Sequence, residues 1–490
     1  MVGVGGRSKA CDNCRRRRVK CDERKPKCER CAKAKLECGG YQEMTIIQFD
    51  GRQRRKLSPS LDSNISATTR SALLPIKEFV RSDWTLGAHL PICTDDIFVE
   101  YTRSRLLQGQ EVDDPVVLPS TVDRPLVQKS FLALSTTFFG LEHKEKELVS
   151  QGFRRYGVAL EYLRQAVGDP SRYTSFDLIE SIMVMSLFEF LISENENGWI
   201  SHALGLEKIM ALRGPESFKK YPEIIMLQNS RMCIILASIL LRRRTILSQP
   251  EWKSIPWSLE PQAKSGMQFL VDILADFPEL FVEKEDIVSN NSFDYRVMKW
   301  GHLRSKVDHV LHQLADWEQD WNMKNPGCCR QVPAPPTTPT VINALGLSIP
   351  AWETIIEYES LYHANTVIVY NATLIMAQRL AQTIAFSGEL HHPSALNAAE
   401  LSDRNLAAGL IICRSIEYHL ESMRKGAGSF FLLFPLRMAH DAIGNSNSII
   451  GAWLQDVLQE IQDGKSGRWA TAKYLLDLQP QLNGKKATGI

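Results

Sequence analysis

Six of the eleven cysteines in this 490-residue chain lie in one short segment near the N-terminus. They form two successive repeats of the spacing C-x2-C-x6-C, with six residues between the repeats: Cys11, Cys14 and Cys21, then Cys28, Cys31 and Cys38. A segment of this length cannot build a hydrophobic core of its own, so cross-links or metal must hold it together. The repeat therefore constrains the fold of this part of the chain more strongly than any helix or strand pattern.

Metal explains the repeat better than disulfides do. The total of cysteines is odd, and residues Met1 to Ala10 lack the apolar stretch of a secretory signal. Two tetrahedral Zn2+ ions need eight coordination positions, so six thiolates hold two ions only if two sulfurs bridge. The internal repeat suggests one bridge from each half. The alternative is one ion with four cysteine ligands and two spare thiols.

This segment resembles the fungal Zn2Cys6 binuclear-cluster transcription factors. Besides the cysteines, Arg15, Lys20 and Pro26 stand where the family has them. The resemblance covers less than a tenth of the chain. It implies two Zn2+ ions per chain, with Cys11 and Cys28 as the bridging sulfurs. It also implies that the first short helix lies against the major groove of double-stranded DNA and reads a CGG-type triplet.

Charge is divided unevenly along the chain. Residues 1–60 hold 17 Lys and Arg against 7 Asp and Glu, whereas residues 61–490 hold 41 against 49. A basic head joined to a mildly acidic body indicates that the head alone meets a polyanion.

Five cations follow the second cysteine within six positions: Arg15, Arg16, Arg17, Arg18 and Lys20. Arginine can donate two hydrogen bonds to O6 and N7 of guanine, and by resemblance Arg17 and Arg18 are the base-reading residues. We assign Arg15, Arg16 and Lys20 to phosphates, which position a protein without specifying sequence. The alternative interpretation is a nuclear-import signal or a solvated surface. A second basic run could also serve import: Arg52, Arg54, Arg55 and Lys56.

One cluster gives limited specificity. Two bidentate contacts supply roughly 2–6 kcal/mol of discrimination, and functional specificity usually needs about 4–10 kcal/mol. A second half-site bound by a partner subunit would supply the difference. Residues 41–80 show no sustained apolar heptad, so dimerisation through the body and monomeric binding both remain open.

We divide the chain into four parts: a flexible N-terminus (1–10), the Zn2Cys6 DNA-binding module (11–38), a basic and polar linker (39–75) and a large all-α regulatory domain (76–490). The fold class is therefore mostly α. Helical periodicity or continuous apolar character marks three segments: 159–167, 178–192 and 406–420. Three phrases resemble the helical regulatory region of fungal transcription factors: residues 199–205, 212–215 and 434–437.

The sequence carries no catalytic motif of the kinds G-x-S-x-G, H-E-x-x-H or P-loop, so we expect no enzyme. We interpret the remaining reactive side chains as structural or unremarkable: His202, His391, His392, Cys233, Cys413, Cys328 and Cys329. Arg242 to Arg244 follow an apolar run and are expected to cap a helix C-terminus. That run, Met232 to Leu241, is too short to span a bilayer, so we expect no membrane partner.

Two functions follow from these patterns. The first is a sequence-specific regulator of RNA polymerase II transcription in the nucleus, with DNA and the transcription machinery as its partners. The second is a scaffold whose cluster contacts RNA or protein and whose helical body is the functional part. Salt weakens the affinity of a DNA regulator, but its preference for particular bases persists. This persistence distinguishes the regulator from the scaffold.

Overall fold

The structure is a computed structural model with two compact units, Met1–Ala88 and His89–Ile490. In the first unit it describes Cys14, Cys21, Asp22, Cys28, Cys31, Lys33 and Ala34. In the second unit, the body, it describes residues 94–108, 124–169, 172, 175–193, 197–342, 346–385, 387, 398–444, 448–464 and 469–472.

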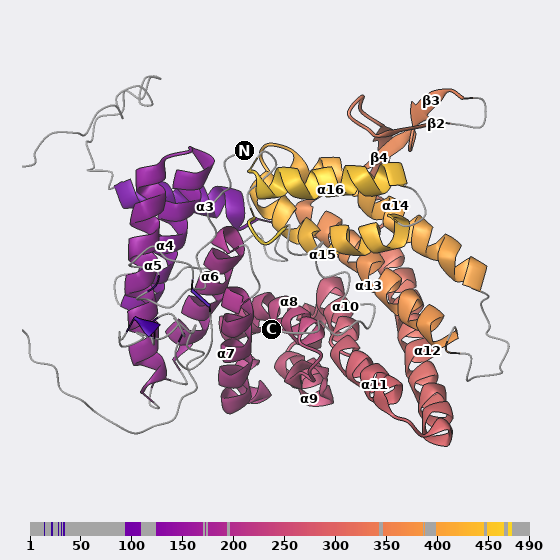
Figure 1. Cartoon of the computed structure of the whole chain (residues 1–490), viewed down its shortest axis with the longest axis horizontal. Helices are drawn as coiled ribbons and strands as arrows, with labels where there is room; N and C mark the ends of the chain where they lie inside the picture. The colour runs from indigo at the N-terminus through magenta and orange to yellow at the C-terminus, as the bar shows by residue number, and fades with distance from the viewer. Residues whose placement is uncertain are drawn as a thin grey trace, which may run out of the picture. The chain divides into compact units, whose positions relative to one another are not determined.

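The body is built mainly from α-helices, as the sequence predicts (Figure 1). The α-helices are α3 (Thr94–Leu106), α4 (Pro125–Glu142), α5 (Lys146–Val167), α6 (Phe176–Ile192), α7 (Asn197–Arg213), α8 (Glu223–Leu240), α9 (Pro250–Ser254), α10 (Gly266–Leu274), α11 (Phe277–Ser289), α12 (Phe293–Lys324), α13 (Leu361–Ala385), α14 (Ala398–Leu420), α15 (Lys425–Ile443) and α16 (Ser448–Gln462). Short 3-10 helices are η4 (Pro215–Phe218), η5 (Ile246–Ser248), η6 (Ile255–Trp257) and η7 (Pro261–Ala263).

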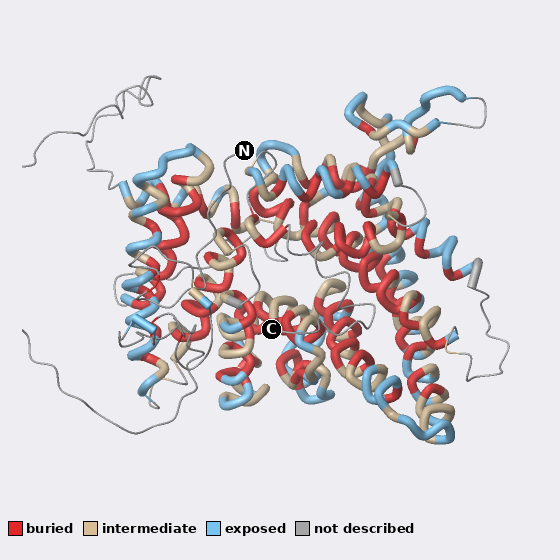
Figure 2. Tube along the Cα trace, viewed as in Figure 1, coloured by how far each residue is buried: buried red, intermediate tan, exposed pale blue. Residues whose placement is uncertain are grey.

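The first helices of the body pack closely, with α4 running along both α5 and α6. A Cβ atom at Gly152 of α5 would lie 2.9 Å from the backbone N of Thr137 in α4, so the α4–α5 approach requires glycine there. Both α5 and α6 cover segments that periodicity predicts to be helical. As its apolar sequence predicts, α6 is buried on almost all sides (Figure 2).

Helix α7 ends where the sequence Gly214-Pro215 predicts a stop. Gly214 has φ +73°, a left-handed conformation that glycine adopts without steric cost, and Pro215 opens η4. Trp199 of α7 is a core residue, as expected, and stacks on Phe190 with ring centroids 4.6 Å apart.

Helix α8 carries a buried arginine in its middle. Arg231 is fully buried and forms an ion pair with Asp272 of α10, while its Nη1 donates to Gln268 Oε1 over 3.0 Å. Lys264, only 7% exposed, forms an ion pair with the same Asp272 carboxylate. Both cations lie over the ring of Trp257, at 5.3 and 4.5 Å from its centroid. These contacts hold α8 against α10 and η6.

Among the described residues, α8 is the helix whose length and apolar composition would suffice to cross a membrane. Half of its 18 residues are buried inside the body. A core helix passes the same test of length and composition, and the ion pair of Arg231 with another helix fits that interpretation.

Four short strands separate α12 from α13, where the sequence predicts a proline-rich loop. They are β1 (Cys329–Pro333), β2 (Thr340–Ile342), β3 (Ser348–Pro350) and β4 (Thr354–Tyr358). β1 pairs antiparallel with β4, with Cys329 opposite Tyr358, and β2 pairs antiparallel with β3. The β2–β3 ribbon projects away from the helices (Figure 1). The body is therefore mostly α, with these two ribbons as an addition to the predicted architecture.

The last four helices cover one another, since α14 packs against both α13 and α15, and α16 packs against α15. Residues 366–370, the best strand candidate in the sequence, lie inside α13, as their helical context predicts. The predicted apolar stripe of α14 is only partly buried, because Cys413 and Ile416 are buried whereas Leu406 is 37% exposed. One large core extends from Leu106 of α3 to Ala472, beyond the end of α16, and a second, small cluster includes Ile356 and Tyr358 of β4.

Candidate metal centre

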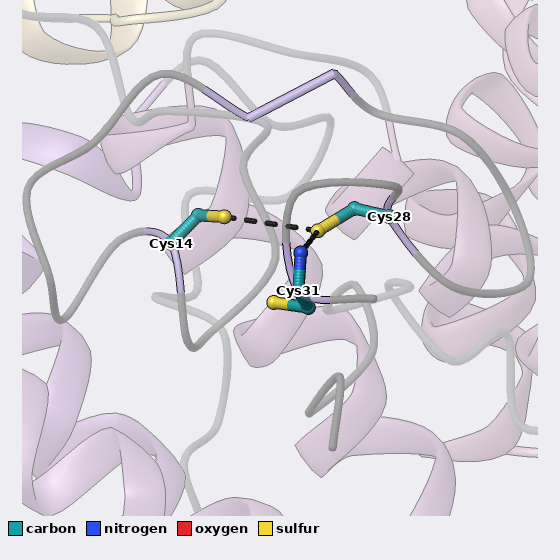
Figure 3. A group of neighbouring side chains, drawn as sticks. All are labelled: Cys14, Cys28 and Cys31. Carbon is teal, nitrogen blue, oxygen red and sulfur yellow. Dashed lines mark hydrogen bonds between the residues drawn. The ribbon is translucent and has the colours of Figure 1, made fainter. Parts of the chain in front are cut away.

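The described cysteines of the N-terminal unit lie close together (Figure 3). Cys14 Sγ is 3.7 Å from Cys28 Sγ, although the two residues are fourteen positions apart in sequence. The backbone N–H of Cys31 donates to Cys28 Sγ over 3.3 Å. All three side chains are buried, so the two halves of the repeat meet at a shared, solvent-shielded point.

Two groups of potential metal ligands share one cysteine. The first group is Cys14, Cys28 and Cys31, and the second is Cys21, Asp22 and Cys28. Within each group the ligand atoms lie within 4.8 Å of one another. A sulfur common to two ligand groups is what a bridging thiolate between two ions requires.

The spacing of these sulfurs also fits zinc. A zinc–sulfur bond of about 2.3 Å places two sulfurs of one tetrahedral site about 3.8 Å apart. The Cys14–Cys28 separation of 3.7 Å matches that edge. Thiolate is a ligand that zinc favours, so the described residues fit the metal on both distance and chemistry.

The other predicted site residues lie outside the described residues. These are Cys11 and Cys38, the five cations Arg15, Arg16, Arg17, Arg18 and Lys20, the linker 39–75 and the pair His391 and His392. Their roles therefore stay predictions.

Comparison with known protein families adds to this geometry. Residues 9–45 match the model of the fungal Zn(2)-Cys(6) binuclear cluster domain, and residues 110–273 match that of the fungal specific transcription factor domain. The chain therefore carries one segment similar to the Zn2Cys6 binuclear cluster domain and another similar to the fungal specific transcription factor domain. The first match includes all six cysteines of the repeat, and the second runs from α4 into α10.

Regulatory proteins of several fungi are similar to parts of this chain. The phomenoic acid biosynthesis cluster-specific transcriptional regulator of Leptosphaeria maculans is 23% identical over 42% of each chain. White-opaque regulator 2 of Candida albicans is 48% identical over 9% of this chain and 10% of its own. Sterol uptake control protein 2 of Saccharomyces cerevisiae is 71% identical over 28 residues, 6% of this chain and 3% of its own. The chain thus spans less than half the length of these relatives, and no solved structure matches it.

His202 lies inside the region of the fungal transcription factor domain, in a hydrogen-bonded cluster. Tyr156 donates its phenol to Glu189 Oε1 over 2.5 Å, and His202 Nε2 lies 3.1 Å from the same phenol oxygen. Burial lowers the pKa of His202, and the Glu189 carboxylate opposes that shift. The histidine is hydrogen-bonded in the packed body, as predicted for a structural side chain.

The arginine run caps the C-terminus of α8, as predicted: Arg242 has φ +51°, and the N–H groups of Arg242 and Arg243 donate to the carbonyls of Ile239 and Ser238 over 3.3 and 3.1 Å. Each arginine forms an ion pair with a glutamate of another helix: Arg242 with Glu285, Arg243 with Glu207, and Arg244 with Glu279. Glu207 belongs to α7 and the other two to α11. The side chains in addition connect the end of α8 to α7 and α11. The sequence did not indicate these partners, which lie 35 or more positions away.

Two isolated thiols of the described body, Cys233 and Cys413, pack in or against the apolar core, as predicted. Burial raises the pKa of Cys233 to about 12, and it also raises the pKa of Cys413. Both thiols are therefore protonated at neutral pH and are poor nucleophiles.

Proposed function

We propose that this protein is a zinc-dependent, sequence-specific DNA-binding regulator of transcription that acts in the nucleus. The observation that carries the proposal is the sharing of Cys28 by two ligand groups, within a segment that matches the Zn2Cys6 domain. Relatives named as regulators, one of them as a transcriptional regulator, support the same function.

In this proposal six cysteines hold two Zn2+ ions: Cys11, Cys14, Cys21, Cys28, Cys31 and Cys38. Cys11 and Cys28 bridge the ions, so each ion reaches four sulfurs. Metal binding then supplies the folding free energy that a segment without a hydrophobic core lacks. Six thiolates and two Zn2+ ions leave a charge of −2, which nearby cations balance.

The DNA contacts divide into two kinds. Arg17 and Arg18 read guanine in a CGG-type triplet through the major groove, whereas Arg15, Arg16 and Lys20 bind phosphates. A homodimer on two half-sites would raise the specificity above that of one cluster. The helical body regulates this activity or associates with the transcription machinery.

The metal part of the proposal can be tested by counting zinc in the purified full chain. Wild type is expected to hold two Zn2+ ions per chain. Cys28→Ser removes a ligand from both sites and is expected to lose both ions, whereas Cys31→Ser is expected to retain one. Equal zinc retention in the two variants would contradict the bridging role of Cys28.

The DNA part is tested with a CGG-containing duplex, a scrambled duplex and an RNA of equal length. Affinity for DNA is expected to fall steeply with salt, with a log–log slope of about −0.9 per phosphate contact. The preference for the CGG duplex should persist at each salt concentration. Equal binding to all three nucleic acids would instead support the scaffold function.

A further inference from the structure

A pocket of about 440 Å³ lies where the β1–β4 ribbon meets the turn between α14 and α15. Adjacent thiols, Cys328 and Cys329, line it together with Tyr418, Glu421 and Arg424 of the helical side. Cys328 is 7% exposed, whereas Cys329 is exposed. The pocket thus presents one inner and one outer thiol from consecutive residues.

The backbone holds both cysteines in place. The N–H of Cys328 donates to the carbonyl of Asn325 over 3.3 Å, and its own carbonyl accepts from the N–H of Glu359 over 2.9 Å. Cys329 opens β1 and pairs with Tyr358 of β4. A dithiol on such a fixed backbone needs little ordering before it binds a ligand.

Four of the charged groups that line the pocket are paired with one another. Arg330 donates to Glu357 Oε2 over 2.6 Å, and Arg424 forms an ion pair with Glu421 while lying 3.9 Å from the ring centroid of Tyr418. An anionic ligand would have to compete with these carboxylates. Besides the Glu359 carboxylate, the two thiols are therefore the reactive groups of this pocket that these ion pairs leave to a ligand.

The protonation state of Cys328 bears on which reactions its thiol can undergo. Burial raises its pKa, the neighbouring Cys329 and the Glu359 carboxylate raise it further, and the Trp321 side chain opposes the shift. Attack on a peroxide needs a thiolate, so the raised pKa disfavours oxidation that begins at Cys328. A ligand that binds both sulfurs displaces the two thiol protons and forms two ligand–sulfur bonds.

The number of side chains that can coordinate an atom at this site limits which metal or metalloid it can bind. Zinc usually takes four ligands in structural sites. Among the described residues, no third His, Cys, Asp or Glu joins these thiols to form a ligand group. Trivalent arsenic that carries one organic group needs only two sulfurs to complete its three bonds.

We propose that Cys328 and Cys329 form a vicinal-dithiol site that binds trivalent organic arsenicals in this pocket. With phenylarsine oxide, both S–H bonds and the arsenic–oxygen bond break, and two arsenic–sulfur bonds form. The two thiol protons leave with the oxygen as one water molecule, and arsenic stays trivalent. The site is separate in sequence from the Zn2Cys6 repeat and does not rest on the proposed DNA binding.

The test uses the zinc-loaded full chain, phenylarsine oxide and mass spectrometry after tryptic digestion. Cleavage after Lys324 and Arg330 releases the peptide 325–330, which contains both cysteines and no other thiol. The expected product is this peptide bridged by one phenylarsenic group, with the zinc content of the protein unchanged.

Variants separate chelation from reaction at a single thiol. Because the second arsenic–sulfur bond forms intramolecularly, Cys328→Ser and Cys329→Ser are each expected to bind the arsenical on the order of 10²-fold more weakly. Cys413→Ser, which removes a buried isolated thiol, is expected to bind like wild type. Circular dichroism verifies the fold, and Cys329→Ser is the safer variant because its side chain is exposed.

Three results would overturn the proposal. The first is an unmodified 325–330 peptide at saturating arsenical. The second is equal affinity in Cys329→Ser and wild type. The third is arsenical uptake matched by release of zinc, which would assign the reaction to the N-terminal cysteines.

Discussion

Replacing Asp272 by alanine is expected to destabilise the body strongly, because two buried cations depend on its carboxylate. Arg231 is fully buried and Lys264 is 7% exposed, and both form ion pairs with Asp272. Removing one partner of a buried pair leaves an uncompensated charge and typically destabilises by about 3–5 kcal/mol. We expect a loss in that range in the free energy of unfolding of Asp272→Ala.

Urea unfolding of the full chain, followed by far-UV circular dichroism, measures this loss. Tryptophan fluorescence is unsuitable because Trp257 contacts both cations. Asp320→Ala is the matched control, since it removes a carboxylate from the exposed Lys324–Asp320 pair. That pair should contribute at most about 1 kcal/mol.

A double variant tests whether charge is the cause. Arg231→Met with Asp272→Leu removes the buried pair and keeps apolar volume, so it should recover much of the loss. Lys264 then remains without its carboxylate, but burial already lowers its pKa and it can release its proton. Equal loss of stability in Asp272→Ala and Asp320→Ala, or a double variant no more stable than Asp272→Ala, would refute an uncompensated buried charge as the cause.

Three further predictions concern the head and the body. In binding-site selection, Arg18→Ala is expected to relax base preference, whereas Lys20→Ala should weaken binding to all sequences alike; matching profiles would show that the two residues share one role. Gly152→Ala should destabilise the body by about 1–3 kcal/mol, because its Cβ atom clashes with α4. Gly157→Ala, on the open side of α5, should stabilise the body by up to about 1 kcal/mol. Urea midpoints that shift in the same direction in the two variants would contradict the packing argument. Burial lowers the pKa of His419 from 6.5 to about 4 in the folded protein. Between these two pH values the unfolded chain binds a proton that the folded chain does not bind. The free energy of unfolding is therefore expected to fall with falling pH, by up to about 1.4 kcal/mol per pH unit. His419→Gln should reduce that slope in urea midpoints between pH 7 and pH 5, and an unchanged slope would show that other groups cause it.

The sequence predicts best those features that depend on neighbouring residues. The end of α7 follows from Gly214-Pro215, because glycine adopts the left-handed conformation and proline cannot continue a helix. The all-round apolar composition of 178–192 likewise predicts a buried helix, which α6 confirms. The cysteine spacing predicts a metal centre, and the meeting of Cys14 with Cys28 fits it.

Features that depend on distant partners are not predictable in this way. In the β1–β4 ribbon, Cys329 pairs with Tyr358, although β2 and β3 lie between them in sequence. Neither five-residue strand has a hydrophobic pattern strong enough to predict this pairing. Arg231 lies in an apolar run, and its stabilising partner Asp272 is 41 residues away. The vicinal thiols were visible in sequence, but their pocket arises only from the contact of β1 with the α14–α15 turn.

We propose that the zinc cluster of residues 11–38 gives the protein its sequence-specific DNA binding. Selection of duplex DNA from a random library by the full-length protein, with and without a zinc chelator, tests it most directly. The proposal predicts enrichment of one or two CGG-type triplets that disappears when zinc is removed. An absence of any enriched sequence, or enrichment that survives the chelator, would contradict it.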